Sequence, residues 1–518
     1  MNEAAHRTRD RGIGAILPAA SLLLLLPAFF ALLAQRLSHG QWGNIFNSDL
    51  LHPYLLVHDL LRDAGAWSGW YHSPALYAFP DWFLAAAAMA LPIAPVWWPF
   101  LYGPALMALH CVAGGAILAN AGLARTSAGA WSMAAILLAV GAITAIGPNA
   151  AVSSSTIVVL AAPNIHTGAI LSALLSTALL LRVLHGRARL PAPAALAALV
   201  AVSSFSDPVF MVWFVGPAAL AAALHAYARR ERRGYWGALI VLGSGVAGLA
   251  IGLGVNPVWL KYAEAGRASG GDALAAFGAF ARSIADRGDF VTIAVAGLCL
   301  VTIARGALVL AVVARRRRLE QSEFLDLLLA GIAAATILAP IVSGSFKHPA
   351  HFRLFLILMP VAAIGAARLL LRWFPASRGM GWLAPAVALL TAAALAFPSI
   401  ARLPQAVTAS ANLQRCIETS GRKTGFADYW TAKLLMFASD RRIHVVQVIA
   451  GGQRFPWIYK ERWFTHRADD DSPARPDFIV PTRLDAEGLR ARFGPPAREL
   501  TCGGQSLWLY DAPLPLPK

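Results

Sequence analysis

Acidic residues beside apolar stretches are the side chains in this sequence best placed to do chemistry. Asp49 lies shortly after the first long apolar stretch, Asp81 precedes another apolar segment, and Asp207 stands between Ser206 and Pro208. At a boundary between lipid and water, a carboxylate can act as a general base or hold a divalent metal such as Mg²⁺ or Mn²⁺. Asp49 is therefore the first candidate for catalysis and for metal binding, and Asp81 and Asp207 are further catalytic candidates.

A helix cap is the alternative role for each of these acids. Asp is a preferred N-cap residue, and Asp49 stands directly before a predicted helix over residues 50–61. Asp81 precedes a helical segment at 82–89, and Asp207 with Pro208 is typical of a helix start. A charged group at the mouth of a membrane span is costly and usually has a purpose, so both roles stay open.

A cationic group predicts where an anion binds. Lys347, His348, His351 and Arg353 lie within seven residues of one another. Arg offers a bidentate fork and Lys a point charge, which makes a lipid phosphate the natural ligand. Pairing with outer-loop carboxylates is the alternative. His52 and His72, in the first long loop, are weaker candidates for substrate binding, because histidines in such loops often only pack.

The composition indicates a membrane protein. Hydrophobic residues make up 58% of the 518 residues and charged residues only 14%, whereas soluble domains carry roughly 25% charged residues. Nine apolar runs approach or reach the roughly 20 residues that cross a bilayer: 13–33, 100–123, 131–146, 168–181, 236–253, 291–313, 327–342, 354–371 and 382–397. We expect about 11 transmembrane helices, or 13 if segments 83–96 and 153–162 also cross.

The distribution of the net charge of +17 sets the expected topology. Basic residues cluster in short loops, including 182–189, 229–233 and 315–318, and one threading puts all of these clusters in the cytoplasm. The same threading puts the N-terminus in the cytoplasm and a long first loop (36–82) and the C-terminal region outside. We therefore expect a bacterial inner-membrane protein with a periplasmic C-terminal domain, and no nucleic-acid partner.

Residues 400–518 read as a separate domain. Charged residues return there, and the pattern predicts a helix at 429–439, strands at 443–449 and 477–481, a helix at 485–493 and a hairpin at 497–510. The expected fold is thus an all-α polytopic membrane domain over 1–399, followed by a small extracytoplasmic α/β domain. Cys416 and Cys502 both fall in the expected oxidising compartment, where a disulfide between them is plausible.

Three local patterns resemble the GT-C glycosyltransferases, in particular the protein-mannosyltransferase-like branch that uses polyprenyl-phosphate sugars. They are Asn47-Ser-Asp49 in an acidic, aromatic first outer loop, the segment Tyr71-His-Ser-Pro74-Ala-Leu-Tyr77 before an apolar span, and the segment from His351-Phe-Arg353 to Pro360. The first loop lacks an adjacent Asp-Asp or Asp-Glu pair.

The resemblance implies a polyprenyl-phosphate-sugar donor, an acceptor glycan, lipid or protein outside the cytoplasm, an inverting transfer, and Asp49 as the catalytic acid residue. Surrounding membrane lipid is the other expected partner. A transporter or flippase, or a non-catalytic component of envelope polysaccharide assembly, is the alternative. Arg305 is the only charge we find near the middle of a predicted span, and it lies close enough to the 315–318 cluster to snorkel. Polar chemistry thus gathers at the outer surface, which favours an enzyme.

Overall fold

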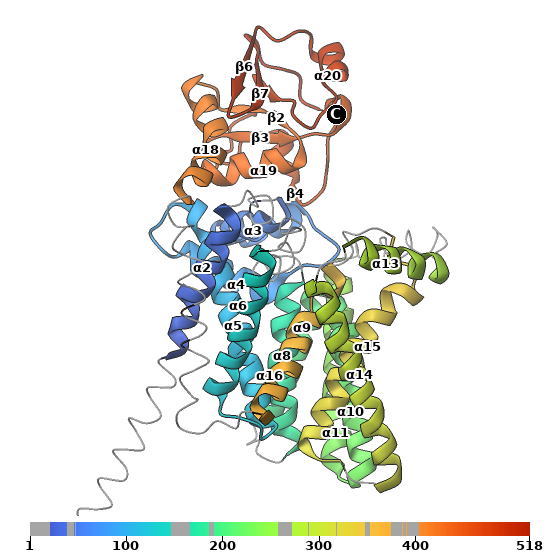
Figure 1. Ribbon diagram of the computed structural model, residues 1–518. Coiled ribbons are helices and arrows are strands. Elements are labelled where there is room, and N and C mark those ends of the chain that lie inside the picture. Colours follow the sequence, from blue (N-terminus) through green and yellow to red (C-terminus); the bar gives the residue numbers. More distant parts are fainter. Residues whose placement is uncertain are drawn as a thin grey trace, which may run out of the picture.

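The computed structural model describes residues 21–38, 46, 48–146, 166–185, 191–256, 272–287, 290–316, 319–347, 353–373, 386, 390 and 403–517. Most of these residues are helical. A bundle of long helices carries a smaller α/β domain at one end (Figure 1). The bundle helices are α2 (Leu25–Ser38), α5 (Trp98–Asn120), α6 (Thr126–Ile146), α8 (Thr167–Leu184), α9 (Pro191–Ser206), α10 (Gly216–Arg229), α11 (Arg232–Val255), α14 (Phe290–Arg316), α15 (Gln321–Val342) and α16 (Leu358–Trp373).

Seven helical segments among the described residues are long and apolar enough to cross a membrane. They are Pro95–Asn120, Thr167–Leu184, Met211–Arg229, Arg232–Val255, Ile293–Arg316, Gln321–Val342 and Arg353–Leu371. Only 17% of the most apolar window of Arg232–Val255 is buried inside the protein. A helix that exposes so much apolar surface is stable in lipid rather than in water. These features suggest a multi-pass membrane protein.

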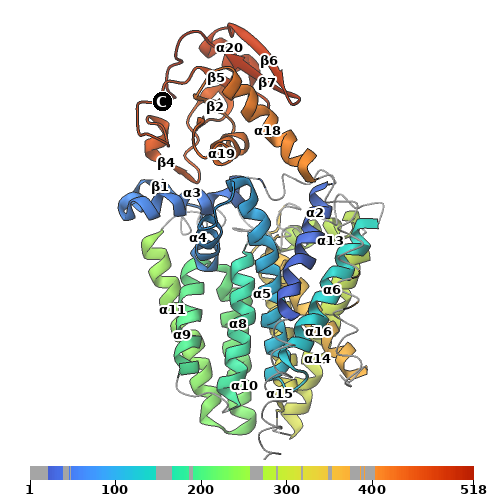
Figure 2. The ribbon, with the colours of Figure 1, turned by 90° about the vertical axis from the view of Figure 1, so that its left-hand side faces the viewer.

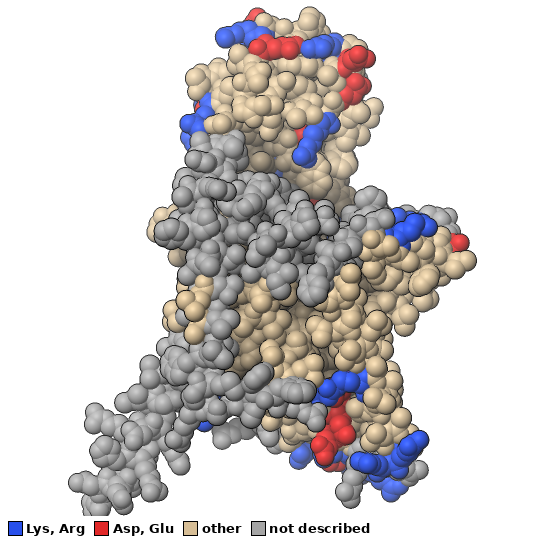
Figure 3. All heavy atoms as spheres, viewed as in Figure 1, with Lys and Arg blue, Asp and Glu red and all other residues tan. Residues whose placement is uncertain are grey.

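The charges on the visible surface follow the same division. In Figure 3, Lys, Arg, Asp and Glu gather on the C-terminal domain, near α13 (Ala273–Arg287) and at the opposite end of the bundle, whereas the described surface between these levels is almost free of them. The turns between α10 and α11 and between α14 and α15 lie at the end of the bundle remote from the C-terminal domain (Figure 2). Arginine-rich loops and the C-terminal domain therefore lie at opposite ends of the apolar region.

Segment 83–96 does not cross the bundle. Its helix α4 (Phe83–Met89) has seven residues and is roughly 10 Å long, a third of the hydrocarbon thickness. The larger predicted count, which needed this crossing, is wrong for this segment. Segment 153–162 and, apart from residues 386 and 390, the apolar run 382–397 lie outside the described residues.

The C-terminal domain is an α/β unit. Its five-stranded sheet has the order β3-β2-β5-β7-β6. Strands β3 (His444–Gln447), β2 (Thr424–Ala427) and β5 (Phe478–Val480) are parallel, whereas β7 (Gln505–Leu509) and β6 (Arg498–Cys502) add an antiparallel hairpin. Helices α18 (Leu403–Thr419), α19 (Tyr429–Ala438) and α20 (Ala486–Phe493) accompany the sheet. Each predicted strand and helix of this region is present, within a few residues of its expected bounds.

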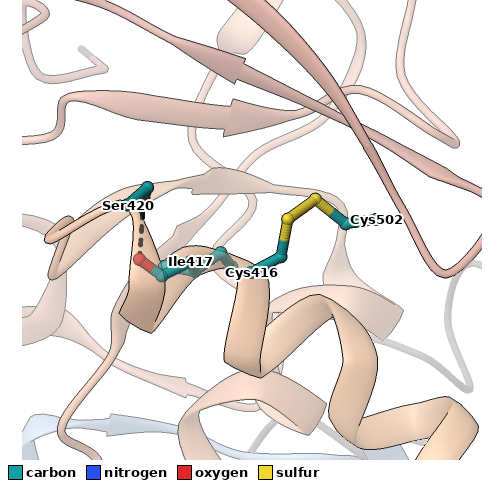
Figure 4. Close-up of a disulfide and its surroundings, with 4 residues drawn as sticks. All are labelled: Cys416, Ile417, Ser420 and Cys502. Atoms are coloured by element: carbon teal, nitrogen blue, oxygen red, sulfur yellow. Dashed lines mark hydrogen bonds between the residues drawn. A yellow bond between two sulfur atoms is a disulfide. The ribbon is translucent and has the colours of Figure 1, made fainter.

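A disulfide ties the two ends of this domain together. Cys416 of α18 is bonded to Cys502 at the end of β6, across 86 residues of sequence (Figure 4). This is the pair expected from the sequence. Cys111 and Cys299 are buried free thiols in the helical bundle. The bond anchors α18, the helix that leads into the domain, to the hairpin at the far edge of its sheet.

The first loop and the C-terminal domain are joined by a second small sheet and a buried ion pair. Strand β1 (Trp70–Tyr71) pairs antiparallel with β4 (Tyr459–Lys460). Asp59 of α3 (Ser48–Arg62) is 6% exposed. It accepts a hydrogen bond of 2.5 Å from Arg441 and lies 3.0 Å from the Lys460 ammonium. The domain is thereby fixed on the loop that carries Asp49.

Helix α3 is largely covered by the rest of the protein. The helix forms as predicted, but its apolar residues Leu50, Leu51, Leu55 and Leu56 are buried within the protein. Tyr54 packs against Phe437 of α19, at 5.5 Å between ring centroids. The amphipathic pattern therefore reflects burial beneath the C-terminal domain, which a hydrophobic period alone does not distinguish from burial in lipid.

Candidate functional site

Tyr77 is a buried residue of the first loop whose pKa responds to all three predicted catalytic acids. It has a left-handed backbone conformation, with φ of 53°, and its N–H donates to the Ser206 carbonyl at 3.0 Å. Burial raises the pKa of Tyr77 well above 10, with further contributions from the negative charges of Asp207, Asp49 and Asp81; the positive charge of Arg353 opposes them. Three acids and one arginine from four separate segments are thus within electrostatic reach of one phenol.

Asp49 is held by the C-terminal domain. It is half-buried in the first turn of α3, which begins at Ser48, so Asp49 is not the residue that precedes the helix. The Tyr429 hydroxyl donates a hydrogen bond to the Asp49 carboxylate, while the Ser48 hydroxyl donates to the Tyr429 carbonyl at 2.5 Å. Asp49 therefore connects α3 directly to α19 of the C-terminal domain.

Lys433, one turn along α19, extends this connection. Its side chain is fully buried, its Nζ donates to the Tyr429 hydroxyl at 3.5 Å, and the same atom lies 4.5 Å from the centre of the Tyr429 ring. Burial lowers the pKa of Lys433 from 10.5 to about 7, and the nearby charge of Asp49 opposes this change. A buried lysine beside a candidate base is a mark of a functional site.

Asp81 is buried between helices. It is 1% exposed and accepts a hydrogen bond from the Tyr102 hydroxyl of α5. It lies in the π-helical turn Ala78–Trp82, and Trp82, not Asp81, holds the cap position of α4. A Cβ atom built on Gly168 would come within 2.9 Å of the Asp81 carboxylate, so only glycine lets the start of α8 approach this acid so closely. The expected cap is thus again a buried, bonded carboxylate.

Asp207 caps its own turn and also contacts a histidine from another segment. One carboxylate oxygen accepts the Val209 N–H at 3.1 Å, as in a local cap. The other oxygen lies 2.6 Å from Nδ1 of His166, the residue that precedes α8. The His166 ring meets Tyr77 edge-on, with 5.4 Å between ring centroids. Asp207 and His166 therefore form one wall of the site around Tyr77.

The predicted cationic group is described only in part. Arg353 and Lys347 are exposed, at the two ends of the undescribed stretch 348–352. Arg353 reaches the Tyr77 site electrostatically. Asn47, His348 and His351 lie outside the described residues. Arg353 is thus related to the Tyr77 site by its charge, and anion binding by this group stays a prediction.

His52 and His72 pack against aromatic rings. His52 is 1% exposed, 5.2 Å from the Trp70 ring, and burial lowers its pKa well below 6.5. His72 stacks on Trp67 at 3.8 Å, and burial lowers its pKa to about 4. Both imidazoles are therefore neutral at physiological pH, which suits packing better than phosphate binding.

The acids that could bind a metal make other contacts in the structure. Within the described ranges, no three His, Cys, Asp or Glu side chains are grouped so that they could hold a metal ion. Asp49 is bonded to Tyr429 and Asp207 lies against His166. The Lys433 amine, whose pKa is about 7, also lies near Asp49, and its protonated form disfavours a second cation there. These residues do not by themselves fit a divalent metal, and binding of Mg²⁺ or Mn²⁺ stays a prediction.

Arg305 pairs with an acid of a neighbouring helix. It donates to Asp326 of α15 at 3.2 Å, and Arg368 of α16 donates to the other oxygen of the same carboxylate. Three neighbouring helices are thereby joined by charge within the apolar bundle. This contact could not be predicted from the sequence, because Asp326 lies just before the apolar run that begins at residue 327 and so outside the predicted span.

No protein-family model matches the chain, and no curated protein is significantly similar to it.

Proposed function

We propose that this chain is a membrane glycosyltransferase that transfers a sugar from a polyprenyl-phosphate-linked donor to a glycan, lipid or protein acceptor on the extracytoplasmic face. The observation that best supports the proposal is the packing of Tyr77 against His166, which is bonded to Asp207; the charges of Asp49, Asp81 and Arg353 also affect the pKa of this phenol. Helix α3, whose Asp49 and Asp59 contact the C-terminal domain, lies where the bundle meets this domain, and the arginine-rich turns lie at the other end (Figures 1 and 2). The positive-inside rule supports a site outside the cytoplasm.

The proposed reaction needs two polarities close together. Asp49, as a carboxylate, removes the proton of the acceptor hydroxyl as its oxygen attacks the anomeric carbon. The bond from that carbon to the phosphate oxygen breaks, and the polyprenyl phosphate leaves with the bonding electrons. Arg353, with Lys347 near it in sequence, is suited to stabilise the phosphate dianion. Tyr429 and Lys433 hold the Asp49 carboxylate in position.

A transporter is the second candidate, and the Arg305–Asp326–Arg368 cluster favours it. Charged residues inside a membrane bundle often mark an ion or substrate path. Here both arginines bind one carboxylate, and Arg368 also donates to the Ser322 carbonyl at 3.1 Å. The cluster therefore supports helix association at least as well as transport, and the enzyme is the better supported function.

The direct test is an assay of sugar transfer. Purified full-length protein is incubated with a panel of polyprenyl-phosphate sugars, and release of the carrier phosphate is measured with and without Mg²⁺ or Mn²⁺. We expect release with at least one sugar donor. If no donor is consumed, while the same preparation moves a lipid-linked donor across a vesicle membrane, the transporter is correct.

A further inference from the structure

A hollow at the arginine-rich end of the bundle has the lining of an anion-binding site. It has a volume of about 270 Å³ and is lined by Ala226, Tyr227, Arg230, Arg232 and Tyr235. These residues come from the end of α10, from the turn and from the start of α11. The volume approaches the lower end of the roughly 300–1,000 Å³ typical of small-ligand pockets. A lipid headgroup is of the right size.

The charge of the hollow is positive and uncompensated by its own lining. Arg230 and Arg232 carry permanent charge, and the remaining lining residues are one alanine and two tyrosines. The acid between the two arginines, Glu231, is 3.6 Å from Arg229 and so already faces another guanidinium. Two guanidinium groups and two phenol hydroxyls are donors that suit a phosphate.

An apolar stripe leads from this hollow along α11. Tyr235, Leu239, Leu242 and Val246 follow one another at helical spacing, and their exposed fractions are 52%, 60%, 48% and 51%. Eleven residues of helix rise about 16 Å, close to the thickness of one leaflet. Leu220 and Tyr227 on α10 are likewise exposed, at 63% and 59%, two turns apart. Acyl chains lying on these faces would start beside the hollow.

We propose that the turn between α10 and α11 is a binding site for an anionic phospholipid, with the phosphate between Arg230 and Arg232 and an acyl chain along the exposed stripe of α11. The basic hollow and the apolar stripe together favour this ligand. A free phosphate would occupy only the hollow, and a zwitterionic lipid would not neutralise the two arginines. Basic pockets between transmembrane helices suit anionic headgroups on general grounds. This inference does not depend on the proposed transferase activity.

The test compares lipids and variants by native mass spectrometry of the full-length protein. Phosphatidylglycerol and phosphatidylcholine with identical acyl chains are titrated into detergent-purified protein. Wild type should retain phosphatidylglycerol roughly tenfold more strongly, as expected for charge-assisted hydrogen bonds to two arginines. The R230Q/R232Q variant should lose this preference. The matched control R315Q/R316Q removes two exposed arginines from the neighbouring turn at the same end and should keep it.

Two further arms separate the sources of the phosphate. Inorganic phosphate and chainless glycerophosphoglycerol should displace bound phosphatidylglycerol poorly, because they lack the chain that lies on α11. If either compound displaced bound lipid as effectively as fresh phosphatidylglycerol, the proposed binding of an acyl chain along α11 would be wrong. An equal preference in wild type and R230Q/R232Q, or an equal loss in R315Q/R316Q, would overturn the site itself.

Discussion

Lys433 is the residue that most clearly marks the candidate site and that the sequence did not reveal. It stands in the apolar segment Ala432-Lys-Leu-Leu-Met436 of a predicted helix, where a lysine would ordinarily point to solvent. In the structure it is fully buried beside Tyr429 and electrostatically coupled to Asp49. Only the docking of α19 onto α3 creates this environment, so no local pattern predicts it.

Replacing Lys433 should change how stability depends on pH. Its pKa is about 7 in the folded protein and 10.5 when unfolded, so unfolding takes up a proton between these values. Wild-type stability should therefore rise with pH across this window, and the cost of burying the charge is complete below it. The gain from pH 6.5 to 9.5 is roughly 3 kcal/mol, and K433M should lack it.

Thermal unfolding of the detergent-solubilised protein at the two pH values measures this difference. The control is K423M, which removes an exposed lysine of the same domain and should keep the wild-type pH dependence. Parallel pH profiles for wild type and K433M would mean that Lys433 is not buried as described.

For single residues, the sequence predicts the acids of the candidate site but not the side chains that contact them. Asp49, Asp81 and Asp207 were selected because charges next to membrane spans are costly. Tyr77, Tyr102, Tyr429 and His166 were not, because aromatic residues near the interface are common and their contacts come from remote parts of the chain. Tyr77 stood within a quoted motif, so its position was visible but its role was not.

Among the elements, α3 does most to position the site. It presents Asp49 on its first turn and Asp59 on its fourth, and both contact the C-terminal domain. Burial raises the pKa of Asp59, but hydrogen bonds and charge from His58, Arg441 and Lys460 outweigh it, and the net pKa is well below the usual range. Asp59 therefore stabilises the folded state at neutral pH and loses this contribution as the pH falls through its lowered pKa.

Removing Arg441 should detach the domain from α3. Its guanidinium is 5% exposed, bonds Asp59 and donates to the Leu55 carbonyl at 2.7 Å. R441M leaves the buried Asp59 carboxylate with fewer partners, at a cost of roughly 3–5 kcal/mol. We expect a lower unfolding temperature and faster proteolysis at the domain boundary.

The matched control is R462M, which breaks the exposed pair with Asp471. It should leave the unfolding temperature nearly unchanged, because exposed pairs contribute little. Equal effects of the two substitutions would contradict the docking role of Arg441.

Periodicity predicted elements better than it predicted their surroundings. The helices and strands of the C-terminal domain follow from alternation, from N-caps such as Asp428 and Asp485, and from the turn at Gly503-Gly504. The apolar face of α3 was also visible, but its covering by protein was not. The pairing of β1 with β4 joins residues nearly 390 positions apart, and two-residue strands leave no readable pattern.

For the whole molecule, the proposed function requires one orientation in the membrane. The arginine-rich turns and the C-terminal domain lie at opposite ends of the bundle (Figures 1 and 2), so the positive-inside rule assigns both ends at once. A reporter that is active only outside the cytoplasm should be active after Lys518 and silent after Arg233 or Arg318. An inactive fusion at Lys518 with active fusions at the two turns would place the site in the cytoplasm.

We propose Asp49 as the catalytic base of a sugar transfer, and one substitution tests this role directly. D49N keeps the size of the side chain and an acceptor for the Tyr429 hydroxyl, but it cannot take up a proton at neutral pH. The control is D63N, which alters an exposed acid of the same loop that caps the turn Ala64–Gly69. With a lipid-linked donor that wild type consumes, D49N should lower turnover about 100- to 10,000-fold with donor binding unchanged, and D63N should match wild type. Wild-type turnover by D49N would show that Asp49 is not the catalytic base.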